Sequence, residues 1–381
     1  MRRRPRSRWP RWRGRAVTTL PRLRIAVLSY GLPTRAHKRG GIERAAHTLA
    51  DGLARRGHEV VVLSHDPRPA DAAYAVAPLP WRAFVETWFG RRVTMGYLGN
   101  LLALVPDYRE FDIVIAHGDS LLLPLAGKPV VRVMHGSALG EARSAASIGR
   151  RVLQLGVFAQ ELVTALVSRG VVGVSENTRR DNPFVRRVIP HGVDERCFSA
   201  SGAGKTRTPS VLFVGTLDGR KRGRFLLDLF QHTVRAEHPE ATLDFVGPAG
   251  PAQPGVTYHT GVTDDVLADL YRRAWVYASP SSYEGFGLPY LEAMACGTPV
   301  VASPNPGSCE VLDDGRCGVL ATDAAFAGEL TAILGDAPRR AALAAQGLCR
   351  AREYSLSRML GEYEDLLYEL TEVHAGSAAR V

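Results

Sequence analysis

Short apolar runs alternate with helical patterns along the chain. Residues 23–31 form one apolar run that ends in glycine, and residues 59–66 form a second. Between them, apolar residues recur at helical spacing as far as Gly57, a residue type suited to the position just past a helix end. Such a strand–helix–strand unit implies parallel strands, because the crossover returns the chain to the end of the sheet at which the first strand began.

The alternation continues through the first half and begins again in the second. Further strands are expected at 112–118, 129–136, 170–178, 211–217, 241–247, 275–281 and 298–304. Helices are expected near 223–237, 264–273 and 289–296, followed by three more helical patterns. The fold class is therefore α/β, with two doubly wound domains that face one another across a cleft.

Composition marks the domain boundaries. Residues 199–209 are rich in Gly, Ser, Thr and Lys without an apolar period, and they are the expected linker. It separates an N-terminal domain at 23–198 from a C-terminal domain at 210–354. Residues 355–381 are expected to form a helix that packs back towards the N-terminal domain. A chain of 381 residues is long enough for two such cores.

Positive charge is concentrated at the amino terminus. The formal net charge is +10, yet residues 1–24 hold ten arginines and no acid, which leaves 38 basic and 38 acidic residues elsewhere. Residues 1–22 are therefore interpreted as a disordered basic arm. The arm is either a solvated tail or a segment that adheres to anionic lipid, with Trp9 and Trp12 at the headgroup level. A neutral body argues against a nucleic-acid-binding protein built on this arm.

The cysteines and the apolar runs bear on the cellular compartment. The five cysteines are scattered without a C-x-x-C pair, a pattern that suits a reducing compartment better than a disulfide framework or a zinc site. No apolar stretch reaches the roughly 18–20 residues of a membrane span. The first apolar run, at 23–32, is expected to be a strand rather than the core of a signal peptide. We expect a cytoplasmic protein, with peripheral contact at the inner face of the membrane as an open alternative.

Residues 283–301 carry the candidate chemistry. Pro289 suits the first turn of a helix, and Gly297 suits the residue after its end. The glycine-rich loop before this helix leaves backbone amides free at a helix N-terminus, which favours an anionic phosphate. Glu292, one turn into the helix, is placed to accept hydrogen bonds from ribose hydroxyls. Glu284 is placed to hold the hydroxyls of a sugar beyond the phosphates, so the expected ligand is a nucleoside diphosphate sugar.

This run resembles the Glu-x7-Glu signature of glycosyltransferase family 4, retaining enzymes with the GT-B fold of two facing Rossmann-like domains. The resemblance covers nearly the whole chain after residue 22. Four other segments are similar to the family's glycine loop, interdomain segment, phosphate strand and last donor-side loop: residues 40–44, 189–194, 214–222 and 306–318.

The resemblance implies roles on the sugar side of the site. Glu284 would contact the donor sugar and Glu292 the ribose, while His135 would lie beside the transferred sugar. His135 and Glu284 are therefore the expected catalytic residues. Gly40 and Gly41 are expected to bind the donor from the N-terminal domain.

The resemblance also implies how the diphosphate is held. Three backbone amides are expected near it: those of Phe286, Gly287 and Leu288. Many family members have an arginine where this chain has Thr216, and Arg220 next to Lys221 is expected to supply that charge. These cations and His135 are expected to meet the loop across the cleft.

Other candidate groups have simpler interpretations. His117 is interpreted as a packed or solvated strand-end residue, and His191 as a residue that lines the domain junction. The acid pairs at 264–265 and 313–314 are interpreted as a helix start and a turn. The chain has no Asp-x-Asp motif, and neither a metal nor another cofactor is expected.

The resemblance favours retaining, metal-independent transfer with same-face attack assisted by the leaving phosphate. The acceptor is a glycan, a lipid-linked molecule or a small molecule, as in cell-envelope or polysaccharide biosynthesis. Residues 81–92 place aromatic residues at helical spacing beside arginines. That segment is interpreted either as a helix packed on the sheet or as an amphipathic helix that faces a membrane.

Two alternatives share the fold. A nucleotide-sugar epimerase should lack the Glu-x7-Glu run, and a phosphorylase would need a pyridoxal phosphate lysine and a much longer chain. A third alternative, from another class, is a non-enzymatic nucleic-acid-binding protein that uses the arginine-rich arm, and the zero net charge of the remaining chain argues against it. Neither the donor base, the sugar nor the acceptor follows from the sequence.

Overall fold

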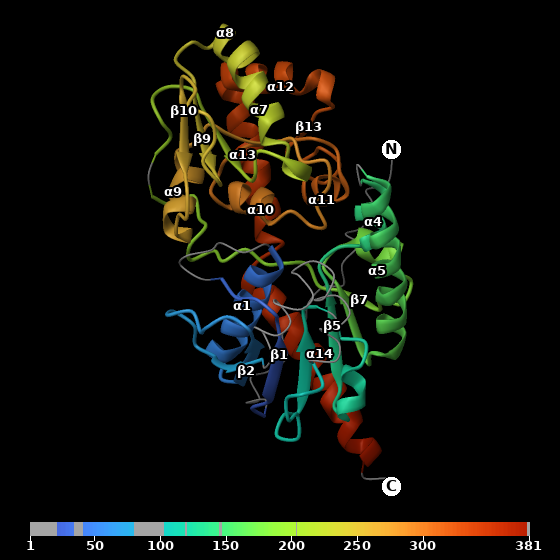
Figure 1. The fold of residues 1–381 in the computed structure, drawn as a ribbon. Helices are drawn as coiled ribbons and strands as arrows, with labels where there is room; N and C mark the ends of the chain where they lie inside the picture. Colours follow the sequence, from blue (N-terminus) through green and yellow to red (C-terminus); the bar gives the residue numbers. More distant parts are fainter. Residues whose placement is uncertain are drawn as a thin grey trace, which may run out of the picture.

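The computed structural model describes residues 21–33, 41–79, 103–118, 120–144, 147–202 and 204–378. Three segments with sequence-based predictions lie outside these ranges: residues 1–20 of the basic arm, Gly40, and residues 81–92. The described chain forms two α/β domains (Figure 1). Two successive helices, α13 Ala337–Arg352 and α14 Leu356–Ala378, run from the C-terminal domain to the N-terminal domain.

A parallel sheet of seven strands forms the centre of the N-terminal domain, in the order β3-β2-β1-β4-β5-β6-β7. The strands are β1 Arg24–Leu28, β2 Glu59–Ser64, β3 Ala75–Pro78, β4 Ile113–Ala116, β5 Val130–Met134, β6 Gly170–Gly173 and β7 Arg187–Val188. Every residue of β4, β5 and β6 is buried. A central parallel strand is covered on both faces, and for that reason these segments are continuous apolar runs rather than alternating ones.

The C-terminal domain contains a second parallel sheet, of six strands, in the order β10-β9-β8-β11-β12-β13. The strands are β8 Ser210–Val214, β9 Thr242–Val246, β10 Val256–His259, β11 Val276–Ser279, β12 Val300–Ala302 and β13 Val319–Leu320. In both sheets the strand order reverses beside the first strand, β1 or β8. This reversal is the topological switch point at which ligands bind in open α/β sheets.

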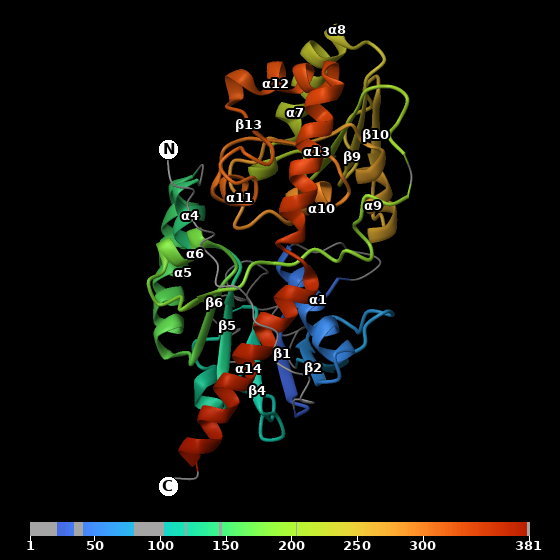
Figure 2. The same cartoon turned by 180° about the vertical axis from the view of Figure 1, so that it is seen from behind.

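Helices flank both sheets (Figure 2). In the N-terminal domain they are α1 Gly41–Arg55, α4 Ala138–Arg143, α5 Ile148–Val167 and α6 Glu176–Asp181, with the 3-10 turn η1 Leu123–Ala126. In the C-terminal domain they are η2 Gly219–Lys221, α7 Gly223–Leu229, η3 Phe230–Val234, α8 Arg235–Glu237, α9 Asp264–Arg273, α10 Leu288–Ala295, α11 Pro306–Val311, α12 Asp323–Gly335 and α13 Ala337–Arg352. The last helix is α14, Leu356–Ala378.

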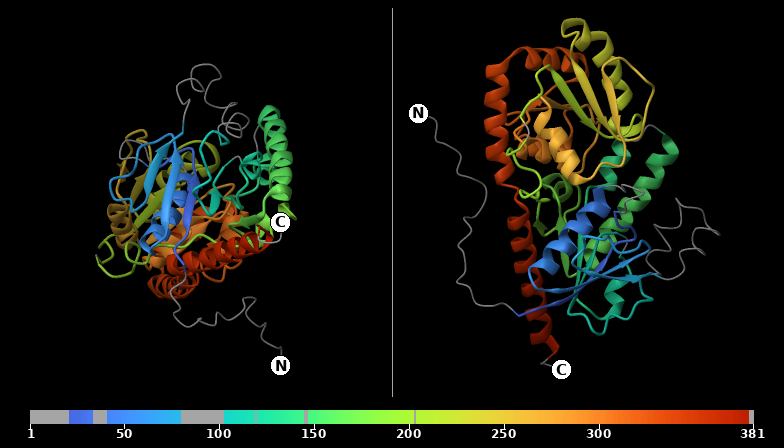
Figure 3. Two further views of the ribbon diagram at one scale, coloured as in Figure 1. Left: turned by 90° about the horizontal axis from the view of Figure 1, so that it is seen from below. Right: turned by 90° about the vertical axis from the view of Figure 1, so that its left-hand side faces the viewer.

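Helix α14 ties the end of the chain to the N-terminal domain. It follows α13 and runs along that domain (Figure 3, right). Arg56 forms an ion pair of 2.5 Å with Glu364 of α14, and the Tyr368 hydroxyl donates to the Pro21 carbonyl at 2.8 Å. Gly52 of α1 lies so close to Leu360 that a Cβ atom would require the leucine to shift.

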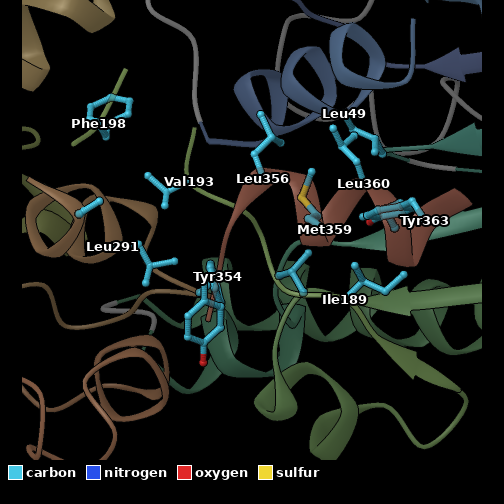
Figure 4. Close-up of a cluster of buried hydrophobic side chains, with 14 of the residues drawn as sticks. Leu49, Ile189, Val193, Phe198, Leu291, Tyr354, Leu356, Met359, Leu360 and Tyr363 are labelled. Carbon is cyan, nitrogen blue, oxygen red and sulfur yellow. The ribbon is translucent and has the colours of Figure 1, made fainter. Parts of the chain in front are cut away.

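A single hydrophobic cluster joins the two domains. Figure 4 shows Leu49 and Ile189 from the N-terminal domain, Leu291 from α10, and Leu360 from α14 in the same cluster. The chain crosses between the domains at Val193, whose amide donates to the Tyr354 carbonyl at 2.8 Å. Apolar burial of this kind holds the cleft residues of the two domains in a defined arrangement.

The structure adds elements that the apolar pattern did not predict. They include the edge strands β3, β7, β10 and β13, the paired helices α4 and α5, and the short helices α6 and α11. The helix expected at 223–237 is divided by the π-helical segment η3. The expected linker, residues 199–209, also has firm contacts. Lys205 donates to the Ala274 carbonyl and the Thr298 hydroxyl, both at 2.7 Å, so this end of the segment packs on the C-terminal domain.

Candidate active site

Three histidines follow the carboxyl ends of the N-terminal strands. His117 follows β4, His135 follows β5, and His191 lies three residues beyond β7. The Nδ1 atom of His117 is 2.8 Å from Nε2 of His135, and Nδ1 of His135 is 3.3 Å from Nε2 of His191. The rings stack with centroids 5.0 and 5.3 Å apart. Both nitrogens of His135 therefore have a histidine partner.

The histidine chain is neutral at physiological pH. Burial lowers the pKa of His117 to about 3 and that of His191 to about 4. Burial, followed by the neighbouring His117 and His191, also holds the pKa of His135 well below its usual value. Each neutral imidazole has one donor and one acceptor nitrogen. The two N–H···N contacts can both form only if all three rings donate in the same direction along the chain.

Opposite the histidines, Glu284 lies on the loop between β11 and α10. Its buried carboxylate accepts from Arg220 Nη1 at 2.6 Å and from Lys221 Nζ at 2.5 Å. Burial alone would raise the pKa of Glu284, but Lys221 and Arg220 hold it below its usual value. Two cations and one carboxylate leave a net positive charge at this point. Such a charge favours a further anion.

The two cations come from the same domain as Glu284. They lie on the short turn η2, which follows β8, and the Arg220 carbonyl accepts from the Ser282 amide at 2.9 Å. The expectation that Arg220 and Lys221 meet the loop across the cleft is therefore wrong. Strands β8 and β11 are neighbours in the C-terminal sheet, so the loops that follow their carboxyl ends lie side by side.

Glycines let the loop approach backbone on both sides. A Cβ atom on Gly285 would collide with the His135 carbonyl oxygen, and one on Gly307 would collide with the Phe286 carbonyl oxygen. Gly287 precedes α10 in the left-handed region, with φ of 104°. Among the described residues, no acceptor pairs with the amides of Phe286, Gly287 and Leu288. Free amides at a helix N-terminus form an anion-binding position.

Glu292 is buried one turn into α10 and connects to the N-terminal domain. Its carboxylate pairs with Arg44 Nη1 at 2.9 Å and accepts from the Tyr271 hydroxyl at 3.2 Å. Arg44, on α1, also reaches Asp264 at 3.2 Å. Burial would lower the pKa of Arg44, but Glu292 and Asp264 raise it, so it remains a cation. Sequence reasoning did not assign a role to Arg44, although it is the last residue of the glycine-loop segment 40–44.

Next to the loop, a cavity of about 250 Å³ opens between the domains. Its wall includes Gly140 and Arg143 of α4, Asn177 and Asp181 of α6, Tyr283 and Pro306. Asp181 pairs with Arg143 at 3.1 Å, while its Oδ2 atom is buried and has no partner among the described residues. The Tyr283 hydroxyl accepts from the Ser137 amide at 3.2 Å, which closes one side of the cavity. Tyr283, which lines the cavity, directly precedes Glu284 in the chain.

The structure brings most of the predicted site residues together. The two cations, Glu284 and the loop amides lie beyond the carboxyl ends of the central strands β8 and β11. The backbone of Gly285 touches that of His135. Gly41 is exposed and begins α1, one helical turn before Arg44. The acid pair at 264–265 starts α9, and that at 313–314 lies in a turn with positive φ angles. The roles assigned to the individual residues stay predictions.

Two features are absent from the described residues. In the described ranges, no three His, Cys, Asp or Glu side chains are grouped so as to hold a metal ion. In the same ranges, no helix combines the length and apolar character needed to cross a bilayer.

Comparison with known proteins gives a consistent result. Residues 39–196 match the family model described as Glycosyltransferase Family 4, and residues 208–336 match Glycosyl transferases group 1. The chain is 32% identical to the MMP alpha-(1->4)-mannosyltransferase of Mycolicibacterium hassiacum, over 83% of this chain and 90% of that protein. It is 29% identical to a phosphatidyl-myo-inositol mannosyltransferase of Mycobacterium tuberculosis, over 90% and 95%.

A solved structure has the same arrangement of domains. HepE of Anabaena, in complex with UDP-glucose, superimposes with a TM-score of 0.69 at 18% identity and covers 91% of this chain and 100% of its own. Two facing parallel-sheet domains of this kind form the GT-B fold, and the family models and relatives identify the chain as a glycosyltransferase. The chain belongs to glycosyltransferase family 4. The relatives named here are transferases, and they give no support to the epimerase alternative.

Proposed function

We propose that this family 4 glycosyltransferase is a retaining enzyme. It moves a hexose from a nucleoside diphosphate sugar to an acceptor hydroxyl without a metal ion. One observation carries the proposal: Lys221 and Arg220 converge on the buried carboxylate of Glu284, beside the unpaired amides that precede α10. The cluster combines fixed positive charge for a diphosphate with a carboxylate for sugar hydroxyls.

The donor extends from Glu284 to Glu292 in this proposal. The diphosphate takes the amides of Phe286, Gly287 and Leu288, and the ribose hydroxyls reach Glu292. The crystallised complex of HepE with UDP-glucose and the two mannosyltransferase relatives support a nucleotide-activated hexose as donor. Because Glu292 already pairs with Arg44, the ribose must share the carboxylate with that guanidinium or displace it.

The chemical step exchanges one bond at the anomeric carbon for another. The bond between the anomeric carbon and the phosphate oxygen breaks, and the diphosphate leaves with the bonding electron pair. The acceptor oxygen forms the new bond on the same face, and its proton passes to the departing phosphate. Lys221, Arg220 and the loop amides stabilise the charge that develops on the leaving group, so these groups can act without a metal ion. The neutral ring of His135 borders the transferred sugar.

The acceptor enters the cavity beside Tyr283. Arg143, Asn177 and Asp181 supply donors and acceptors there, and the Oδ2 atom of Asp181 lacks a partner among the described residues. The hydroxyl groups of a sugar or cyclitol ring can form hydrogen bonds with the polar side chains of this wall. The names of the relatives, which include a phosphatidyl-myo-inositol mannosyltransferase, are consistent with a polyhydroxyl acceptor.

The donor is tested first by binding. Thermal-shift measurements with UDP, GDP and ADP should show a rise in melting temperature for one base, because a ligand bound to the folded state stabilises it by mass action. With that base identified, each candidate hexose is supplied as its nucleoside diphosphate, and release of the diphosphate is followed over a panel of hydroxylated acceptors. The absence of a shift with every nucleotide would contradict the proposed donor site.

The mechanism is tested with the same assay. Glu284→Ala should abolish transfer while the protein stays folded, and chelation of divalent metals should leave the rate unchanged. NMR of the product anomeric proton should show the configuration of the donor. An inverted product, or full dependence on an added metal ion, would contradict the corresponding part of the proposal.

A further inference from the structure

Helix α5 turns an apolar side outwards. Five of its large apolar side chains are strongly exposed and recur at helical spacing: Ile148 at 81%, Val152 at 64%, Leu155 at 46%, Val163 at 48% and Leu166 at 62%. At 100° per residue these positions, with Ala159 between them, fall within a sector of about 80°. We call this the outward face of α5. A surface helix normally buries such a stripe.

The inner side of α5 carries the polar contacts instead. Glu161 accepts from the Ala138 amide at 3.2 Å, and Gln154 donates to Glu141 of α4 at 3.0 Å. The buried residues of the helix are Thr164 and Ala165. The helix is therefore held to the domain through polar groups, small residues and the partly buried Val157, Phe158 and Leu162. The exposed apolar stripe has no partner among the described residues. Figures 1 and 2 place α4 and α5 at the outer edge of the N-terminal domain.

The charges at both ends of the outward face have one sign. Arg151 is exposed in the first turn of α5, and Arg169 is exposed just beyond its last turn. Arg150 lies on the inner side instead, where it pairs with Glu141 of α4 at 3.8 Å. No acidic residue falls within the apolar sector, since Glu161 points towards α4. A second copy of the helix would bring arginine onto arginine in either orientation, because both ends are basic. A flat anionic surface would instead complement both ends.

We infer that the outward face of α5 docks onto a membrane surface that contains anionic lipid. The apolar stripe enters the boundary between headgroups and acyl chains, and the arginines contact the lipid phosphates. Helix α5 packs on α4, and α4 forms one wall of the acceptor cavity. Docking therefore brings the cavity close to the headgroups. With the proposed function as its basis, this inference identifies the acceptor as a polyhydroxyl group carried by a lipid.

Vesicle flotation of the full chain tests the surface without any use of activity. Phosphatidylcholine vesicles with and without phosphatidylglycerol are compared, at low and at raised salt, which weakens the contribution of exposed arginines. The wild type should float with the anionic vesicles. The double substitution Val152→Glu/Leu166→Glu should weaken this binding about tenfold or more, because it puts two carboxylates into the apolar stripe.

A matched control separates the helix from general hydrophobicity and from the basic arm. Leu125→Glu alters an apolar residue that is 75% exposed on η1, an element that is not part of the outward face of α5, and it should float like the wild type. Undiminished flotation of the double variant would overturn the inference, as would wild type that fails to bind anionic vesicles. Light scattering tests the alternative occupant, a second copy of the chain. A wild type that is dimeric and a double variant that is monomeric would assign the face to a second copy and overturn the inference.

Nucleotide binding keeps the two proposals apart. The double variant should retain the wild-type thermal shift with the preferred nucleotide, because α5 lies outside the donor site. A wild type that floats but binds no nucleotide would refute the proposed function and leave the docking surface standing. A wild type that transfers sugar but does not bind vesicles would refute the docking surface and leave the proposed function standing.

Discussion

At the scale of single residues, the site depends on charges that are partly compensated before any ligand arrives. Glu284 is paired with Lys221 and Arg220, so the cations are already fixed at their positions. Fixed charge of this kind stabilises a leaving group without reorganisation during the reaction. Glu284 in turn keeps the two cations from drifting towards solvent.

Lys221 offers the most direct test of this arrangement. Lys221→Ala should reduce kcat by about 10²- to 10³-fold, because one preorganised charge next to the leaving diphosphate is lost. The melting temperature should fall only moderately, because Arg220 still pairs with the buried carboxylate of Glu284. Initial rates of diphosphate release are the measurement. Arg224→Ala is the control: Arg224 is exposed and pairs with Asp218 outside the site, and a similar loss there would contradict the assignment.

The histidine chain predicts a dependence of stability on pH. The folded pKa values, about 3 for His117 and about 4 for His191, lie below the ordinary value of about 6.5. Between these limits the unfolded chain binds more protons, so the free energy of unfolding is retained above about pH 6.5 and falls as the pH drops. Each ring should contribute about 1.4 kcal/mol per pH unit in that window.

Denaturant unfolding at several pH values between about 7.5 and 5 measures this slope, in a range above the ordinary pKa values of the carboxylates. His117→Gln should reduce the slope of the free energy of unfolding against pH by about 1.4 kcal/mol per pH unit, the contribution of one ring. His232→Gln alters an exposed side chain and should leave the slope unchanged. An identical slope in wild type and His117→Gln would show that the ring is not held neutral by burial.

Predictability from sequence differs among these residues for a physical reason. Glu284 and Glu292 flank one loop and one helix, so their relation to a helix N-terminus is local and visible in the sequence. Arg44 meets Glu292 only because the two domains dock, and no local pattern encodes that contact. The same holds for His117 and His191, which reach His135 through the order of strands in the sheet.

At the scale of elements, α10 and the loop before it organise the donor side. All residues of α10 from Tyr290 to Ala295 are buried, which fixes the direction of its N-terminus. The loop then fits between two stretches of backbone, and Gly285 and Gly307 allow this close approach. The position of the free amides thus depends on residues that contact no ligand.

Gly285→Ala should reduce kcat/KM by about 10²-fold, because the added methyl group collides with the His135 carbonyl oxygen and shifts the loop by a fraction of an ångström or more. Steady-state kinetics with a melting curve are the measurements. Gly328→Ala in α12 is a matched control: nothing lies within 4 Å of its Cβ position, and we expect unchanged kinetics and a gain of about 0.5–1 kcal/mol in stability. Wild-type kinetics for Gly285→Ala would show that the loop has room to move.

Periodicity predicted the central strands and α9 because these elements bury a regular pattern. The edge strands β7 and β13 have two residues each, too few to show an alternation. Helix α5 is a different case, because it contacts the protein through a mixed polar and apolar side while a second apolar side faces outwards. Reasoning that assigns apolar stripes to the core places such a helix wrongly. The exception coincides with the inferred docking surface, where another partner takes the role of the core.

At the scale of the whole molecule, the domains meet through several contacts, of which three differ in kind. They are the hydrophobic cluster around α14, the backbone crossing at Val193, and the ion pair between Arg44 and Glu292. The ion pair occupies the Glu292 carboxylate, which is proposed to bind the ribose. Under the proposed function, domain contact and donor binding compete for this one carboxylate.

Arg44→Met should lower the free energy of unfolding by about 1–3 kcal/mol, because Glu292 is left buried with Tyr271 as its remaining partner. The same variant should show a larger rise in melting temperature with the preferred nucleotide than the wild type does, since the ribose no longer competes with a guanidinium. Denaturant unfolding and thermal shift measure the two quantities. Arg44→Met/Glu292→Gln should regain part of the lost stability, because the buried charge is removed as well.

Arg56→Met is the matched control, since Arg56 pairs with Glu364 of α14 away from the cleft. It removes another ion pair between the N-terminal domain and a distant part of the chain, and its nucleotide shift should equal that of the wild type. A smaller nucleotide shift in Arg44→Met would mean that Arg44 assists the donor instead of competing with it. In that case the guanidinium and Glu292 would form one binding unit, and domain closure and donor binding would reinforce each other.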